Sequence, residues 1–405
     1  MSRFAFLLLI TALSLFYSPG PTFGQTASIT GITELTSLPV NDCDGIALGD
    51  IDGDGTTDFL TSSGAEGGVF WFEQGEGPTD WRRHVIYGDA TEIEGNDLAD
   101  FTGNGQPEAL SLDQKTGEIL LHRPIEDPQG AWNTTAIQSE RLFLQASLPT
   151  DIDGDDRPEL VYTWEGTKEG AGGIHWLNYE GGPVQDPDSW TDHHMIVHES
   201  AWWLVPQRMN ANDDGSSREI VYTARSLQDR NAGAKPGLFW IEPGSDPTSS
   251  WTRHAIDTTL THPLHVDVGT FSSDGSHRDL LVGGFETEAL FYYTWTASWH
   301  RHGLDLPALD GSPFTEIWNV KALPVPEHSR DAMLAVLSRP SGSAMVLYGP
   351  EDGRYRARAL KQMPYTHPLD DRLLLHDLTG DGYPEMIVPD SGGGKLSIYQ
   401  FELSP

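Results

Sequence analysis

The sequence has little cysteine and little positive charge. Cys43 is the single cysteine among 405 residues, so the chain forms no internal disulfide and no zinc site built from cysteine pairs. Lys and Arg number 25 against 60 Asp and Glu, which gives a formal net charge of −35. Nucleic acids and anionic membrane surfaces are recognised through clustered basic residues, so this balance disfavours both as partners. It favours cations and neutral or basic ligands.

Long apolar runs are absent after the first residues. Phe4 to Tyr17 is apolar and follows the basic start Ser2-Arg3; its length is typical of a signal-peptide core and is short for a bilayer span. We therefore predict a signal peptide at residues 1–24, with an uncleaved anchor as the alternative, and a secreted, extracellular or periplasmic location. No later segment reaches about 18 apolar residues, so we expect no membrane span in the mature chain.

An acidic motif recurs along the chain. Successive copies begin 50, 51, 59, 60 and 107 residues apart, and the last spacing corresponds to two periods. A degenerate copy is therefore expected near Ala322, which makes seven repeats. The first copy reads Asp-Ile-Asp-Gly-Asp-Gly-Thr-Thr-Asp from Asp50 to Asp58, and altered copies begin at Asp100, Asp151, Asn210, Thr270 and Asp377.

Each period contains four short strand-like segments separated by Gly, Pro and Asp. The first leads into the acidic motif, the second leaves it, the third is aromatic and the fourth carries Trp-x-x-His. Four strands in about 40 to 60 residues are typical of a propeller blade. We predict an all-β fold: one seven-bladed β-propeller of four-stranded antiparallel blades at residues 25–405. The last repeat has three strands, and we expect Ile29 to Leu38 to supply the fourth and close the ring.

The acidic motif, the aromatic strand and the Trp-x-x-His strand resemble the FG-GAP/VCBS repeats, the family that includes the integrin α-chain propeller. The resemblance covers residues 28 to 403. It implies a seven-bladed propeller whose blade loops hold Ca²⁺ and which binds ligands outside the cell. The chain departs from the pattern in three repeats: the sixth has lost the acidic motif, and the fourth and fifth carry one extra residue.

The chemistry of the motif also predicts several structural calcium sites. Ca²⁺ takes about six to eight oxygen ligands, and acids at alternate positions can point inward where glycine permits a sharp turn. An EF-hand is rejected because its twelfth position should be Glu, where the strongest copies have Thr61, Tyr162 and Val388. Unloaded Asx-turns are the alternative. The expected ligands are Asp50, Asp52, Asp54 and Asp58 in repeat one; Asp100, Asn104 and Glu108 in repeat two; Asp151, Asp153, Asp155 and Glu159 in repeat three; and Asp377, Thr379, Asp381 and Glu385 in repeat seven.

Histidines and tryptophans fall into two groups. The histidines of the Trp-x-x-His strands repeat with the blade, so we expect packing or hydrogen bonding between blades rather than chemistry. Residues just before each first strand do not repeat, and we expect them to face one mouth of the central channel. Acids and an indole there suit a sugar, although an ordinary solvated mouth is the alternative. The candidate ligand-binding residues are Asp44, Glu94, Trp202, Trp203, Glu316 and Asp371.

Two classes of function follow. The first is a secreted, calcium-stabilised binding or adhesion module whose partner is a carbohydrate or an extracellular protein. The alternative is a carbohydrate-active enzyme. A polysaccharide lyase or sugar dehydratase would use His262 or His265 as the base and Arg372 as the cation. A glycoside hydrolase would pair Asp44 with Glu94 or Asp371. A purely structural or assembly role is the third interpretation.

Overall fold

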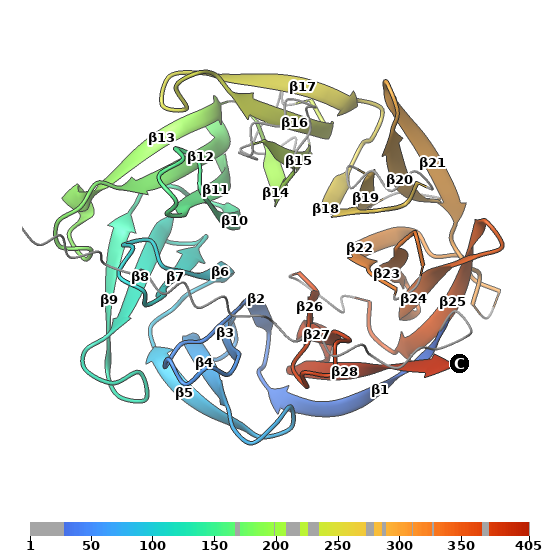
Figure 1. The fold of residues 1–405 in the computed structure, drawn as a ribbon, viewed down its shortest axis with the longest axis horizontal. Helices are drawn as coiled ribbons and strands as arrows, with labels where there is room; N and C mark the ends of the chain where they lie inside the picture. Colours follow the sequence, from blue (N-terminus) through green and yellow to red (C-terminus); the bar gives the residue numbers. More distant parts are fainter. Residues whose placement is uncertain are drawn as a thin grey trace, which may run out of the picture.

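Seven four-stranded antiparallel sheets form a ring in the computed structural model (Figure 1). The structure describes residues 28–166, 171–197, 199–207, 219–225, 235–272, 279–285, 289–309, 311–325, 328–366 and 372–404. In six sheets the strands follow chain order from the axis outwards, and in the seventh β26, β27 and β28 are followed by β1, so the predicted seven-bladed propeller is confirmed. Over these residues no helix is both long and apolar enough to cross a membrane.

The blades have the following strands. Blade one is β2 (Cys43–Gly49), β3 (Asp58–Ser63), β4 (Gly68–Gln74) and β5 (Trp81–Tyr87); blade two is β6 (Ile93–Ala99), β7 (Glu108–Asp113), β8 (Glu118–Pro124) and β9 (Trp132–Gln138); blade three is β10 (Leu144–Thr150), β11 (Glu159–Gly166), β12 (Ala171–Tyr179) and β13 (Trp190–Val197). Blade four is β14 (Ala201–Pro206), β15 (Ile220–Ala224), β16 (Gly237–Pro243) and β17 (Trp251–Asp257); blade five is β18 (Pro263–Gly269), β19 (Asp279–Gly284), β20 (Ala289–Trp295) and β21 (Trp299–Asp305); blade six is β22 (Glu316–Leu323), β23 (Ala332–Arg339), β24 (Gly342–Glu351) and β25 (Arg354–Met363). Blade seven is β26 (Leu374–His376), β27 (Glu385–Asp390), β28 (Lys395–Ser404) and β1 (Ser28–Pro39), and short 3₁₀ turns occur at Pro187–Ser189 and Ser391–Gly393.

The ring is closed by the first strand of the described chain. In blade seven β1 pairs antiparallel with β28, from Ser28 opposite Ser404 to Pro39 opposite Lys395 (Figure 1). The prediction that Ile29 to Leu38 completes the last blade is therefore confirmed. Without β1, the N–H and C=O groups along the outer edge of β28 would lose their partners.

Apolar side chains are buried between blades rather than in one central core. Seven clusters of buried residues fill the seven junctions between neighbouring blades. One of them joins blade seven to blade one, and it contains Leu38 of β1 beside Phe59 and Phe72. Because every blade contributes to two clusters, each sheet depends on both of its neighbours for burial.

Within a blade, the fourth strand stacks its histidine on an aromatic ring of the third. The Trp240 and His254 rings lie 4.1 Å apart at 15°, and the His254 imidazole contacts the Glu242 carboxylate at 2.8 Å. The same stack joins Trp71 to His84, Trp176 to His193, and Tyr292 to His302. The repeated histidines serve packing, as predicted. These contacts lie within one sheet, however, so the expectation of contacts between blades was wrong for the stacks.

Ring closure leads to a test. A chain beginning at residue 41 lacks β1 and should melt at a lower temperature and aggregate, because β28 becomes an open edge and the Leu38 cluster loses a wall. The control is a chain beginning at residue 28. Thermal unfolding with light scattering measures both effects, and equal melting of the two chains would contradict the role of β1.

Candidate functional site

The two predicted sets of functional residues lie at opposite ends of the innermost strands. Each acidic loop follows the end of a first strand, as residues 50–57 follow β2. The predicted mouth residues Asp44, Glu94 and Trp203 instead lie near the beginnings of first strands. The loops and the mouth are therefore separate sites on opposite faces of the ring.

In blade one, the acidic loop folds its own backbone around carboxylates. Asp50 accepts hydrogen bonds from the N–H groups of Gly53 and Gly55, at 2.7 and 3.0 Å. Both glycines have positive φ, +80° and +89°, which explains why the motif has glycine there. Asp58 is buried and accepts from the N–H groups of Ile51 and Gln74, both at 3.0 Å. The loop therefore ties the end of β2 to the start of β3.

Two loops bring three carboxylates together. One oxygen from each of Asp50, Asp52 and Asp58 lies within 4.8 Å of the others, and the same holds for Asp151, Asp153 and Glu159. Burial, reinforced by the neighbouring aspartates, raises the pKa of Asp58 to about 6 and that of Glu159 to about 7, although backbone hydrogen bonds oppose the shift. The folded protein thus holds negative charge that lacks full compensation, and this donor set fits a hard divalent cation.

The aspartate at the fifth position of each of these two loops lies outside the group of three carboxylates. The Asp54 carboxylate accepts from the Thr56 backbone N–H and hydroxyl, at 2.7 and 2.6 Å. Asp155 pairs with the Arg157 guanidinium, whose Nε lies 2.8 Å away. The structure therefore brings together positions one, three and nine of the motif, and Asp54 and Asp155 lie outside the clusters.

The loops of blades two and seven place an amide or a hydroxyl beside their last acid, and in blade two Arg123 also lies 3.9 Å from Glu108. In blade two, the Asn104 side chain donates to Glu108 at 3.3 Å, while Asp100 accepts the Asn104 backbone N–H. In blade seven, Thr379 donates through its hydroxyl to Glu385 at 3.4 Å. Asp377 accepts backbone N–H groups from Gly380, Asp381 and Gly382. Most of the stretched loops of repeats four and five, 208–218 and 273–278, lies outside the described residues.

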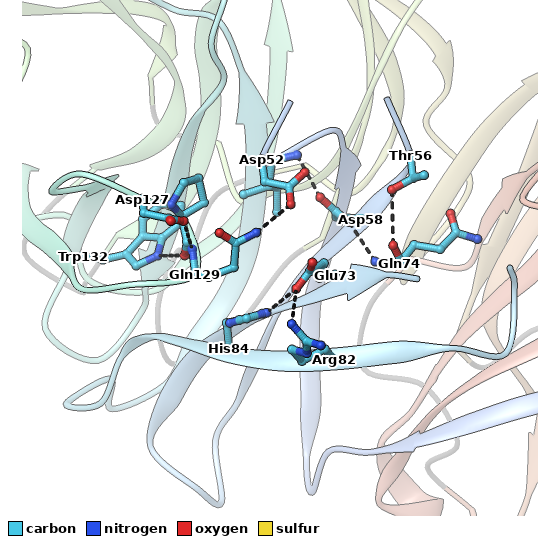
Figure 2. A network of polar contacts seen from close by, with 12 residues as sticks. Asp52, Thr56, Asp58, Glu73, Gln74, Arg82, His84, Asp127, Gln129 and Trp132 are labelled. Carbon is cyan, nitrogen blue, oxygen red and sulfur yellow. Dashed lines mark hydrogen bonds and ion pairs between the residues drawn. The ribbon is translucent and has the colours of Figure 1, made fainter. Parts of the chain in front are cut away.

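The blade one loop is also linked to blade two. Figure 2 shows the Gln129 side chain, from the turn between β8 and β9, donating to Asp52 at 2.9 Å. The same view shows Asp58 beside Gln74, and Glu73 contacted by Arg82 and His84. A substitution of Asp52 would therefore also remove a contact between blade one and blade two.

At the other end, the mouth residues lie inside the first strands rather than before them. Six of the seven first strands, β26 excepted, have a β-bulge near this end, such as the one between Ala201 and Trp203. A bulge re-aims successive side chains, which explains how Trp202 and Trp203 reach different surroundings. Arg372 precedes β26, and Asp371 lies outside the described residues.

One group of these residues packs at the axis of the ring. The Arg372 guanidinium donates to the Ser147 carbonyl at 3.1 Å, lies 4.0 Å from the Asp97 carboxylate and 5.3 Å from the Trp203 ring. Trp203 in turn meets the buried His265 ring edge-on at 4.2 Å. Burial lowers the pKa of His265 to about 3, so the imidazole is neutral at physiological pH. We call Asp97, Ser147, Trp203, His265 and Arg372 the axial cluster.

A second group lines a cleft. Glu94 and Trp202 lie in a depression of about 450 Å³ together with Glu92, Gln114 and Arg225, among others. The Gln114 side chain donates to both Glu92 and Glu94. The Arg225 guanidinium lies 3.3 Å over the Trp202 ring and forms an ion pair with the buried Glu165 at 2.8 Å. We call this depression, formed by blades two, three and four, the Trp202 cleft.

The other predicted residues within the described ranges do not line the Trp202 cleft. Glu316 accepts from the Trp318 indole N–H at 2.9 Å, and the Asp44 carboxylate accepts the N–H of Gly45. His262 lines a smaller, separate depression of about 170 Å³ beside Phe285. Of the predicted ligand-binding residues that the structure describes, only Glu94 and Trp202 therefore share the cleft.

Sequence reasoning missed three polar residues of this region. Gln114, Glu165 and Arg225 each lie six residues after the last acid of their loop, Glu108, Glu159 and Glu219. This position falls at the end of the second strand, so in three consecutive blades it places a polar side chain beside the same cleft. The repeat alignment could have revealed it had it been extended past the loops.

Comparison with known proteins supports the fold. No protein-family model and no curated protein matches this chain. Among solved structures, BBS1N in complex with ARL6DN is similar with a TM-score of 0.53 at 12% identity, covering 93% of this chain and 97% of that one. An Agrocybe aegerita lectin, described as recognising non-reducing terminal N-acetylglucosamine, has a TM-score of 0.50 at 11% identity, covering 93% and 86%. The exotype rhamnogalacturonan lyase YesX reaches 0.46 at 13% identity, covering 92% and 76%.

The Arg225–Glu165 pair provides a stability test. Arg225→Ala should lower the free energy of unfolding by about 3–5 kcal/mol, because it removes the cation beside a carboxylate whose side chain is 0% exposed. Adding Glu165→Gln should recover part of the loss, since the buried charge is then removed. Arg82→Ala is the control, because this side chain is 74% exposed and 3.7 Å from Glu73. Denaturant unfolding measures all three, and equal losses for Arg225→Ala and Arg82→Ala would contradict this account.

Proposed function

We propose that the protein is a secreted carbohydrate-binding module that takes its ligand in the Trp202 cleft. The observation that carries the proposal is that Trp202 and two carboxylates share one depression. An indole covers the apolar face of a sugar ring, while carboxylate and amide groups bind its hydroxyls. Glu92, Glu94 and Gln114 supply those polar groups.

The cleft is ordered before a ligand arrives. Arg225 is held by Glu165 and covers one face of Trp202, which fixes the indole orientation. Gln114 bridges the two glutamates. A site whose side chains are already immobilised loses less conformational entropy on binding, which favours affinity for a small ligand.

The net charge of the Trp202 cleft determines which sugars it can bind. Of the two cations in the cleft, Arg225 is balanced by Glu165, so Lys115 remains against Glu92 and Glu94. The cleft is therefore net acidic within a protein of charge −35. A uronate would be repelled, so neutral sugars and amino sugars are the expected ligands.

The enzyme alternative receives less support from the same region. His265, the proposed base, is 5% exposed with its pKa lowered by burial, and Arg372, the proposed cation, is engaged with Ser147 and Asp97. His262 and Asp44 lie outside the Trp202 cleft, which separates them from Glu94. Binding rather than elimination or hydrolysis is therefore the function that the geometry favours.

Trp202→Ala tests the binding site. Loss of the indole should weaken retention on neutral and amino-sugar glycans by about tenfold or more, because the ring platform is removed. Trp132→Ala, in an outer strand of blade two, is the matched control and should bind like the parent. Glycan-array retention and an assay for new reducing or unsaturated ends are read together. Products, or binding that survives Trp202→Ala, would count against the proposal, and capture of protein partners alone would favour a protein ligand.

We also propose that Ca²⁺ stabilises the propeller at the loops of blades one and three. The residues that would hold it are Asp50, Asp52 and Asp58, and their counterparts Asp151, Asp153 and Glu159. The bound cation would balance the negative charge of carboxylates that are buried without a cationic side chain beside them. Because each loop joins the first strand to the second, occupancy would strengthen the blade rather than act on a ligand at the opposite face.

Calcium should raise the melting temperature. Ligand at 100 times its Kd adds about 2.7 kcal/mol per site to the folded state. Asp52→Asn with Asp153→Asn should abolish most of this gain, whereas Asp80→Asn with Asp246→Asn, two exposed turn acids, should preserve it.

The calcium effect should also depend on pH. In chelator, the pKa values of Asp58 and Glu159 are raised in the folded protein, so the contribution of these two carboxyl groups to stability falls as pH rises through about 6 to 7. The calcium gain should therefore be larger at pH 8 than at pH 5.5, and a melt insensitive to calcium would refute the sites.

A further inference from the structure

The outer strand of blade six is unusually basic for this protein. β25 contains Arg354, Arg356, Arg358 and Lys361, four of only 25 basic residues in the chain. The other six outer strands carry at most two Lys or Arg each, and β1, β9 and β13 carry none. Between Arg330 and Lys361 there are six basic and three acidic residues, although the whole chain has a net charge of −35.

The three arginines form a straight row. They alternate along β25 and therefore lie on one side of the strand, and all three are exposed. The strand rise places their Cα atoms about 7 Å apart, so the row spans about 13 Å. The register of β25 against β24 is regular from Arg354 to Arg358, so no bulge turns one of them away. Tyr355, between the first two, packs toward the interior instead.

Neighbouring acids leave most of the row available. Arg356 contacts Glu351 through Nε at 3.3 Å, yet its side chain remains 66% exposed. Arg358 donates to the carbonyl of Thr30 at 3.4 Å, which brings the row to the seam with β1. Each guanidinium has five N–H donors in a planar fork that matches a carboxylate, so a single contact leaves donors for a ligand.

Protection of the strand edge does not account for the row. Charged residues on an edge strand discourage unwanted pairing. However, β9 and β13 occupy the same outermost position in their sheets without any Lys or Arg. Blade six is also the blade that lacks the acidic loop, so its local charge differs from that of the rest of the ring.

We propose that the outer strand of blade six is a second binding surface, for a linear polysaccharide that carries carboxylates, a polyuronate. At physiological ionic strength charges are screened beyond about 8 Å, so a polymer lying along β25 feels the arginines more strongly than the distant acidic loops. Guanidinium groups in a line fit regularly spaced carboxylates of an extended polymer. This surface is separate from the Trp202 cleft and does not rest on the function proposed there.

Charge density favours a polyuronate over other polyanions. Duplex DNA carries one negative charge per about 1.7 Å, so the −35 body repels it more strongly than a polymer with one charge per sugar. A second copy of this chain would bring another 35 net negative charges, so the two bodies would repel each other.

The test is retention on immobilised polygalacturonate in chelator at 50 and 500 mM NaCl. The parent should bind at low salt and elute at high salt. Arg354→Gln with Arg356→Gln should raise the Kd about tenfold or more. Arg82→Gln with Arg83→Gln removes the same charge from the outer strand of blade one and should bind like the parent. Trp202→Ala should also bind like the parent, which separates this proposal from the carbohydrate cleft. Thermal melts verify that each variant folds.

Several results would overturn the proposal. These are no retention of the parent, equal weakening by both arginine pairs, or tighter binding of duplex DNA or dextran sulfate than of polygalacturonate. Retention that requires Ca²⁺ and ignores the arginines would place the polymer at the acidic loops. Self-association that disappears in the Arg354/Arg356 variant, without polymer binding, would make this surface a contact between copies of the chain.

Discussion

The pairing of β1 with β28 is the contact on which the rest of the structure depends. Each blade buries its apolar residues only against its neighbours, so an open ring would leave two blades with an uncovered face. The functional geometry needs closure as well. Arg372 comes from blade seven, yet it reaches Ser147 of blade three and Asp97 of blade two across the axis. The axial cluster therefore exists only when the first and last parts of the chain are joined.

Buried carboxylates have a nearby cationic side chain in some parts of the ring and lack one in others. At the mouth, Glu165 has Arg225 within 2.8 Å. At the axis, Arg372 lies 4.0 Å from Asp97, whose pKa burial nevertheless raises. In the loops of blades one and three no cation of the chain faces the buried Asp58 or Glu159 as closely within the described residues. These two loops therefore hold the least compensated buried carboxylates of the three places, and the proposal of calcium sites rests on that difference.

The architecture could be predicted from the sequence because its determinants repeat. Seven periods, four strands in each and the spare strand at Ile29 to Leu38 all follow from local patterns, and the structure has them. The site could be predicted only in part. Glu94 and Trp202 were found because they break the repeat, but Arg225 and Glu165 meet across two blades, a distance that no periodicity encodes. The β-bulges near the beginning of the first strands also determine which side chains face the same cleft or cluster. Trp202 and Trp203, adjacent in sequence, consequently belong to a cleft and to the axial cluster.

Blade six shows how degeneration of one repeat can change a surface. The connection between its first and second strands lacks the acidic motif that the other blades carry. The blade nevertheless keeps its apolar strands, and β23 is buried along its whole length. On the outer strand, Tyr355 and Met363 pack against the clusters on either side, whereas Arg354, Arg356 and Arg358 are exposed and take no part in that packing. The same fold thereby presents an acidic face, a polar mouth and a basic rim. These three surfaces lie on different parts of the blades, so a substitution in one leaves the residues of the others in place.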